Sequence, residues 1–178
     1  MYTRIGAAAG FYALKNFGMD VNDVEQFVAG LIYGLIQKDD LTKIQTCLKD
    51  ASGLETEIEQ AVADFSKGDI TDIMAGVELV GKIIQELPTD LGDCQAMQDD
   101  INRIEAWAQI FSDPTKLVQT LLTNVVAHFS QISADASATV TAFKSADYYH
   151  AGDDISDLLV QALGPVPQSP ETLEMTQW

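Results

Sequence analysis

Proline, cysteine, histidine and positive charge are all scarce in this sequence. Its 178 residues include five prolines, three of which (Pro165, Pro167 and Pro170) lie near the C-terminal end, and the first 87 residues contain none. Because proline breaks helix interiors, its absence from the first half favours long helices. The two histidines and two cysteines leave few side chains for a metal centre or a catalytic nucleophile.

Positive charge shows the largest deficit. Ten lysines and arginines stand against 27 aspartates and glutamates, which gives a net charge of −17. Such a surface repels phosphate groups, so we expect no nucleic-acid partner and no docking on anionic lipid. The acidity suits a salty or calcium-rich setting or a basic partner, and it also serves simply to keep a protein soluble.

Apolar side chains are plentiful, at 47% of the chain, which indicates a folded protein of one domain or at most two. The most apolar run is residues 27–36, which carry no charge. A membrane-spanning helix needs roughly 20 apolar residues, so we predict no membrane span and instead a helix buried on nearly all sides. Gly30 and Gly34 lie one helical turn apart, a spacing that predicts close packing of another helix.

Elsewhere, apolar residues recur at steps of three and four, the spacing of one helix face. This pattern, together with capping residues, predicts helices over about residues 21–37, 41–67, 70–87, 90–111, 114–143 and 154–163. Pro88 is expected to end the third helix. The core face of the fifth is expected to include Val118, Leu122, Val125 and Phe129. No stretch alternates as a strand would. Short connections and a period near 3.5 predict an all-α fold, an antiparallel up-down bundle of five to six helices.

Two terminal segments flank the predicted bundle domain of residues 20–163. Residues 1–19 are rich in small side chains and resemble a signal peptide poorly, so we expect a short helix there and any export leader upstream. Residues 164–178 form an extended, proline-rich, acidic tail without a core-forming pattern. Leu173, Met175 and Trp178 could anchor this tail on its own bundle or, as we favour, on a neighbouring subunit.

Cys47 and Cys94 are predicted to form a disulfide. The second and fourth predicted helices run parallel, and the cysteines lie about six and about four residues from the helix starts, heights within about 3 Å. Closing a loop of roughly 48 residues stabilises by about 4 kcal/mol in the chain-entropy model. A disulfide implies an oxidising compartment, whereas two buried free thiols would suit a cytosolic protein.

The histidines carry no recognisable chemistry. Asp147 and His150 would share one helix face, but the Glu-x-x-His pairs of a di-metal bundle are missing. His128 is expected to be a partly exposed helix residue. Neither histidine has an evident serine or cysteine partner, so we expect no enzyme activity and no cofactor.

Three acidic doublets could suggest calcium ligands, yet none fits the loop of an EF-hand. They lie near predicted helix starts, where capping explains acidic residues, and weak calcium contacts between acidic surfaces are the alternative. The doublets are Asp39-Asp40, Asp99-Asp100 and Asp153-Asp154. We expect no dedicated metal site.

Sparse positions of the chain resemble a group of known proteins. The patterns are Phe27-x-x-Gly30-Leu31-x-x-Gly34-Leu35, Cys47, Leu87-Pro88-x-x-Leu91-x-x-Cys94 and Tyr149-x-x-Gly152-x-Asp154-Ile155. Over about residues 24–166 the order resembles that of small, cysteine-paired, all-helical exported proteins of ciliates and other protists. The resemblance implies a luminal or extracellular location and no catalytic residues, although no convincing leader precedes residue 24.

Together these observations predict a structural or interaction protein in the extracellular space or the secretory-compartment lumen. We expect a disulfide-locked bundle that forms homo-oligomers or polymers, such as filaments, through its terminal segments. At −17 per subunit, assembly should need screening cations, with a weak dependence on divalent ions. The alternative is a binding module that holds a lipid or other hydrophobic ligand inside the bundle.

Overall fold

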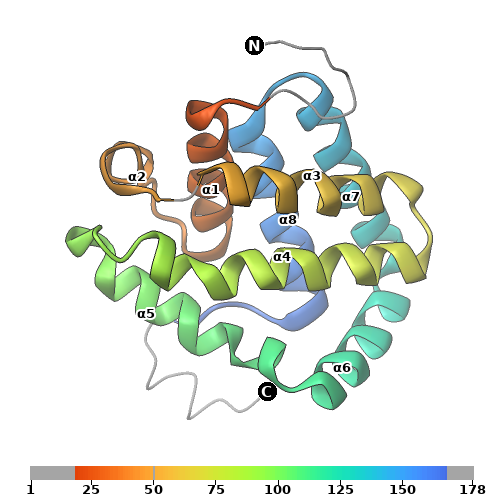
Figure 1. Cartoon of the computed structure of the whole chain (residues 1–178). Helices are drawn as coiled ribbons and strands as arrows, with labels where there is room; N and C mark the ends of the chain where they lie inside the picture. Colours follow the sequence, from red (N-terminus) through yellow and green to blue (C-terminus); the bar gives the residue numbers. More distant parts are fainter. Residues whose placement is uncertain (1–18, 50, 168–178) are drawn as a thin grey trace.

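The computed structural model describes residues 19–49 and 51–167, which form an all-helical fold without strands (Figure 1). The all-α prediction is confirmed, but these residues form eight α-helices, where the sequence predicted five to six. The helices are α1 (Val21–Ile36), α2 (Leu41–Cys47), α3 (Ala51–Lys67), α4 (Ile70–Asp90), α5 (Gln98–Trp107), α6 (Pro114–Ala127), α7 (Phe129–Lys144) and α8 (Tyr148–Leu163). Two 3-10 turns, η1 (Gln95–Met97) and η2 (Ala108–Ser112), flank α5.

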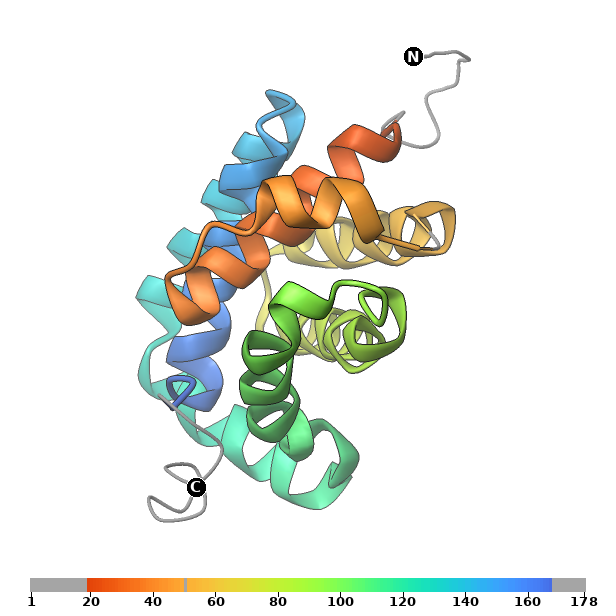
Figure 2. The same ribbon diagram turned by 90° about the vertical axis from the view of Figure 1, so that its left-hand side faces the viewer.

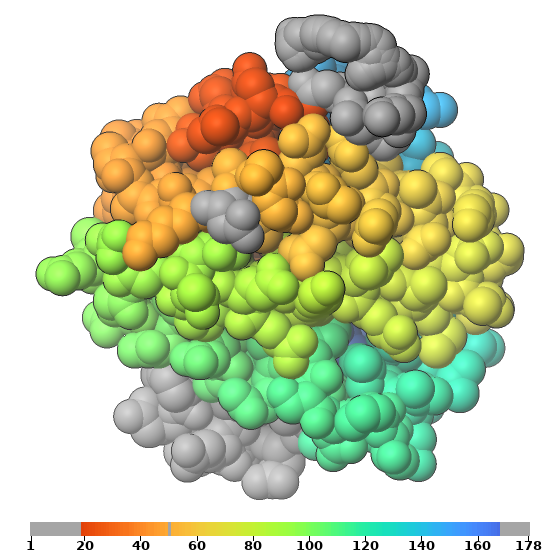
Figure 3. All heavy atoms as spheres, viewed as in Figure 1, coloured from red at the N-terminus to blue at the C-terminus, as the bar shows by residue number. Residues whose placement is uncertain are grey.

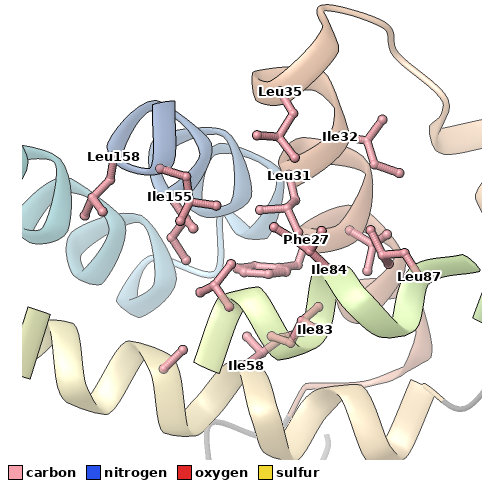
Figure 4. Close-up of a cluster of buried hydrophobic side chains, with 14 of the residues drawn as sticks. Phe27, Leu31, Ile32, Leu35, Ile58, Ile83, Ile84, Leu87, Ile155 and Leu158 are labelled. Atoms are coloured by element: carbon pink, nitrogen blue, oxygen red, sulfur yellow. The ribbon is translucent and has the colours of Figure 1, made fainter. Parts of the chain in front are cut away.

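Helix α1 forms the centre of the fold. Asp20 and Asp23 cap its N-terminus reciprocally, each carboxylate accepting from the other's backbone N–H. Apart from Tyr33, every residue of the uncharged run at 27–36 is buried, as the sequence predicted. Side chains from α3, α4 and α8 complete this core (Figure 4), in which each fully buried leucine, isoleucine or phenylalanine stabilises by about 1.5–3 kcal/mol.

The other helices form pairs around α1. Helices α3 and α4 lie side by side, α7 lies beside α8, and α8 makes the most extensive contact with α1. The α3–α4 pair runs across the direction of α1 and α8 (Figures 1 and 2), so the arrangement is crossed and is not the predicted up-down bundle. The spacing of apolar residues did not predict this arrangement. It indicates which face of a helix is buried, but it does not determine the crossing angle with the helix packed against that face.

A two-residue turn places α3 beside α4. Gly68 has a left-handed backbone (φ 80°), a conformation that glycine adopts without steric cost. The next residue, Asp69, caps α4 by accepting from the backbone N–H of Asp72 at 2.8 Å. The turn therefore ends one helix and begins the next within two residues.

Two predicted helices are each divided in the structure. The helix predicted over 41–67 is interrupted after Cys47, where Leu48 is extended (ψ 134°). The helix predicted over 114–143 is interrupted at His128 (φ −118°, ψ 27°). Neither break carries a glycine or proline, so no local signal marked it in the sequence.

Three predicted helix ends were also wrong. The helix predicted from residue 90 begins only at Gln98, as α5. Helix α4 continues through Pro88 to Asp90, since a proline in the last turn removes only one helix hydrogen bond. Helix α8 begins at Tyr148, six residues before the predicted start at Asp154, and the Asp147 carboxylate caps it through the backbone N–H of His150.

Candidate interaction site

The last described residues, 164–167, which we call the strap, leave the end of α8 and run to α5 (Figure 1). The carbonyl of Gly164 accepts a hydrogen bond from the indole Nε1 of the fully buried Trp107 at 2.9 Å. The carbonyl of Pro167 accepts from Nε of Arg103 at 3.0 Å, and Val166 between them is buried. The strap thus gives the tail a defined starting point. Its predicted anchors Leu173, Met175 and Trp178 lie outside the described residues.

Helix α6 carries an exposed apolar row, which we call the α6 face. Val118, Leu122 and Val126 are 40%, 48% and 59% exposed, at i, i+4 and i+8. Placing Val118 and Leu122 in the core was therefore wrong: the buried row of α6 is Leu117, Leu121 and Val125, one residue earlier. Both rows are apolar in the sequence, so the pattern alone could not say which one faced inward.

The chain around the α6 face is unusual for its charge. No aspartate or glutamate occurs between Asp113 and Asp135, although the whole chain carries 27 of them. Lys116 is the only lysine or arginine in that interval. In Figure 3 the teal surface of α6 adjoins the green surface of α5 at the lower right. The α6 face therefore combines exposed apolar area with the longest interval without acidic residues in the described part of the chain.

Gly30 and Gly34 bring α1 and α8 into close contact. A Cβ added at Gly30 would lie 1.9 Å from the carbonyl oxygen of Tyr149, and one at Gly34 would lie 2.4 Å from Cβ of Ser156. Gly152 of α8 is as close from the other side, 2.2 Å from the carbonyl oxygen of Phe27. The buried hydroxyl of Ser156 donates to the carbonyl of Leu31 across the same crossing. These glycines serve helix packing and leave no space for a ligand between α1 and α8.

The predicted disulfide is present, with the Cα atoms of Cys47 and Cys94 5.4 Å apart. The predicted geometry was wrong, since the cysteines are not level on two parallel helices. Cys47 ends the seven-residue α2, and Cys94 lies in the turn before η1. The predicted pairing of the two cysteines is nevertheless correct, because both segments end at the same corner of the fold.

Polar links join α2 and its flanking residues to the same segment as the disulfide does. The backbone N–H of Lys49 donates to the carbonyl of Asp90 at 3.0 Å, and Nζ of Lys38 pairs with Asp100 at 2.9 Å. Of the residues in α2 itself, Ile44 alone is buried. The α2 corner is therefore attached by covalent and polar contacts more than by apolar packing.

Asp40 and Asp100 form a buried acidic pair at this corner, only 3% and 4% exposed. Burial raises the pKa of Asp40, the adjacent Asp100 raises it further, and Lys43 at 3.3 Å opposes the shift. The sequence predicted that Asp40 caps α2, but its side chain makes no capping hydrogen bond. The carboxylate of Asp39 accepts a hydrogen bond from the backbone N–H of Leu41 instead. Asp100 lies in the first turn of α5 without a side-chain cap contact there.

Two of the surface cavities lie between α3 and its neighbouring helices. One, of about 290 Å³, is lined by Gly53, Glu57, Glu86, Thr89 and Asp90. Burial and the neighbouring Glu57 raise the pKa of Glu86 to about 7, although Lys82, 3.4 Å from Glu57, opposes this. The other, of about 330 Å³, is lined by Phe65, Ser66, Gly68, Ser133, Ser137, Val140, Thr141 and Lys144. Both linings mix polar and apolar groups, unlike the predominantly apolar lining of a lipid site.

Helix α8 carries a row of carboxylates. Burial, followed by the charges of Asp153, Asp135 and Asp154, raises the pKa of Asp157 to about 6. Burial raises the pKa of Asp153, and burial followed by the charge of Asp153 raises the pKa of Asp154, while His150 opposes both shifts. This doublet lies inside α8 and caps nothing, so its predicted capping role was wrong.

Neither histidine contacts a serine or cysteine side chain through a hydrogen bond within the described residues. Nδ1 of His150 lies 2.7 Å from the Asp147 carboxylate on the surface, and His128 is exposed at the α6–α7 break. Across residues 19–49 and 51–167, no cluster of three or more histidine, cysteine, aspartate or glutamate side chains could hold a metal ion. None of the helices in these ranges has the length and apolarity required to cross a membrane.

Comparison with known proteins gives one match. A family model described as SctB-like, Secreted protein B-like, matches residues 8–163, which include every described helix. No curated protein and no solved structure shows significant similarity to the chain.

Proposed function

The chain belongs to the Secreted protein B-like family, and on this premise we propose that it is an exported structural protein that assembles with copies of itself through its terminal segments. In this proposal it acts in the extracellular space or the secretory-compartment lumen. The disulfide between Cys47 and Cys94 supports this location, because such bonds persist in oxidising compartments.

The strap is the observation that carries the proposal. Contacts with Trp107 and Arg103 hold residues 164–167 in place, so the tail starts from a defined point near α5. The tail beyond it combines two glutamates with Leu173, Met175 and Trp178. A fixed base and apolar anchors allow the tail to reach a neighbouring copy in one direction. Repeated contacts of this kind that do not close on themselves form filaments.

Charge sets the conditions for assembly. Two copies at −17 each repel one another, and the repulsion extends over about 10 Å at 0.1 M salt and about 3 Å at 1 M salt. Assembly should therefore strengthen with ionic strength. Divalent cations should act at lower concentrations than sodium does, because exposed carboxylates bind them weakly.

The proposed role needs no catalysis and no cofactor. The partly polar cavities, the surface pair of Asp147 and His150 and the close α1–α8 crossing support a packing protein over an enzyme. The alternative of a hydrophobic ligand inside the bundle gains no support either, since the core is filled by side chains such as Trp107 and Phe27, both fully buried.

Removal of residues 168–178 tests the proposal, because it deletes the tail and keeps the strap. We expect the full chain to form large assemblies in electron micrographs and in light scattering at high salt, and the shortened chain to form none. A control replaces Thr172, Thr176 and Gln177 by serine and leaves the three apolar anchors in place; it should assemble normally. Assembly of the shortened chain into particles of the same size and shape would contradict the proposal.

A further inference from the structure

The α6 face is the most apolar exposed feature of the described residues that neither the core nor the strap uses. Five large hydrophobic side chains are exposed in these residues, and Val118, Leu122 and Val126 are three of them. They stand in one row, whereas Val21 and Ile70 begin two other helices. A contiguous apolar row on an otherwise acidic protein is typical of an interaction surface.

We propose that the α6 face packs against the α6 face of a second copy, in a two-fold symmetric contact. This inference rests on the proposed function, since it names a second contact for the same assembly, independent of the tail. A symmetric contact uses one surface twice, so a row that is its own partner suffices to build it.

Charge points to a second copy as the occupant. Any two surfaces of this chain repel through a net charge of −17 each, but the interval around α6, residues 114–134, contains no acidic residue. Two α6 faces therefore approach with less repulsion than two of the acid-bearing helices of the described residues would. A two-fold axis across the helices also runs them in opposite directions. This brings Lys116, in the first turn of one α6, toward the negative C-terminal end of the other.

The spacing of the row sets the geometry of the pair. Side chains at i, i+4 and i+8 form the ridge of an α-helix that packs into the corresponding groove of another at about −50°, with axes about 8–10 Å apart. Val118 and Val126 span about 12 Å, close to the length of one such crossing. The exposed Gln119 and Thr123 border the row with neutral polar groups, which are suited to the rim of an interface.

The size of the contact predicts its strength. One helix pair buries far less than the ~800 Å² per partner of a standard stable interface. We therefore expect weak pairing of free chains and effective pairing once the tail raises their local concentration. The tail and the α6 face then act together: the tail contact alone forms filaments, the symmetric α6 contact alone forms pairs, and the two contacts together cross-link the filaments.

The first test changes the charge of the row in the full chain. Leu122→Glu places a carboxylate at the centre of the proposed contact, and Gln131→Glu adds the same charge at an exposed position of α7. By sedimentation equilibrium in 0.5 M sodium chloride, we expect Leu122→Glu to weaken association at least tenfold and Gln131→Glu to leave it within twofold. Thermal unfolding monitors the fold, which a half-exposed position should barely affect. Equal association of the two variants, or a full chain that stays monomeric at millimolar concentration, would overturn the inference.

The second test reports the partner directly. Both cysteines of the chain form the disulfide, so Leu122→Cys adds the only free thiol. We expect a short bismaleimide to link two copies of Leu122→Cys and to link Gln131→Cys poorly. If Leu122→Glu disrupts assembly while Leu122→Cys gives no linked pairs, the face binds something other than itself, and the inference is wrong.

The two proposals fail separately. Removal of residues 168–178 should abolish large assemblies yet preserve the linked pairs of Leu122→Cys. Large assemblies that survive the removal would contradict the proposed role of the tail, and linked pairs in that protein would still support the α6 contact. Loss of the linked pairs on removal of the tail would overturn an independent α6 contact.

Discussion

A substitution at the α1–α8 crossing gives the most demanding test of the fold. In Gly30→Ala the added Cβ would lie 1.9 Å from the carbonyl oxygen and 2.8 Å from the carbonyl carbon of Tyr149. Both are backbone atoms, so no side-chain rotation relieves the clash. Because ordinary van der Waals contact begins near 3.4 Å, the backbones of α1 and α8 must separate by about 1.5 Å at this point.

The expected cost has opposing contributions. Alanine in place of glycine favours a helix interior by about 1 kcal/mol. Against this, overpacking of a tight core costs about 1–3 kcal/mol. Moving α8 outward also weakens the contacts of Leu31 and Ile155, since a gap of 0.5–1 Å already forfeits a quarter to a half of the dispersion energy. We expect the free energy of unfolding to fall by about 3 kcal/mol, which lowers Tm by about 6–12 °C in a protein of this size.

Gly81→Ala provides a matched control. Its added Cβ would also be too close to neighbouring atoms, at 2.3 Å, but these belong to the ring of Phe111, a side chain that is only partly buried and can move. We expect a change of no more than about 1 kcal/mol, because the gain in helix propensity offsets the movement of the ring. Urea unfolding followed by circular dichroism measures both variants. If Gly30→Ala is as stable as Gly81→Ala, the close approach of α1 and α8 is refuted.

Three further predictions concern the disulfide, the buried acids and the strap. Joint replacement of Cys47 and Cys94 by serine should lower the free energy of unfolding by about 4 kcal/mol. The rate of amide hydrogen exchange should rise most in α2, because Ile44 is its only buried residue. An equal rise in exchange rate across all helices would contradict the view that the disulfide holds α2 in place. The pKa is raised to about 7 for Glu86 and about 6 for Asp157, so their stabilising contribution is complete below about pH 4 and is lost as the pH rises through 6–7. The urea concentration at the unfolding midpoint should therefore fall between pH 5 and pH 8, and it should fall less in Glu86→Gln. A midpoint that does not change with pH would contradict both pKa shifts. Trp107→Phe removes the hydrogen-bond donor to the Gly164 carbonyl, so the free energy of unfolding should fall by about 1–3 kcal/mol. Proteases should also cleave the chain faster after Leu163. Cleavage at the original rate would show that the strap does not depend on the indole.

The sequence was informative wherever a property is local. The uncharged run at 27–36 predicted a buried helix, and Gly30 and Gly34 predicted that another helix, which proved to be α8, packs closely against it. The pairing of Cys47 with Cys94 was also correct, although the reasoning assumed two parallel helices that do not exist. That success came from having two cysteines and one way to pair them.

The sequence failed where distant contacts decide. The breaks after Cys47 and at His128 carry no glycine or proline. At the first break, α2 packs chiefly against α1 and α3 chiefly against α4, whereas α6 and α7 on either side of the second break both contact α8. Asp40 and Asp100 are 60 residues apart, so no local sequence pattern predicted that they would lie together as a buried pair. The same is true of the strap, whose hydrogen-bond donors Arg103 and Trp107 lie on another helix.

Helix α6 shows most clearly what each level determines. The sequence by itself determined that α6 is a helix with two adjacent apolar rows in an interval without acidic residues, because helix periodicity and charge are read along the chain. Only the tertiary structure decided that Leu117, Leu121 and Val125 face the core and that Val118, Leu122 and Val126 face outward. The physical reason is that a helix of two apolar rows can bury either one at similar cost, and the neighbouring helices determine which row is covered.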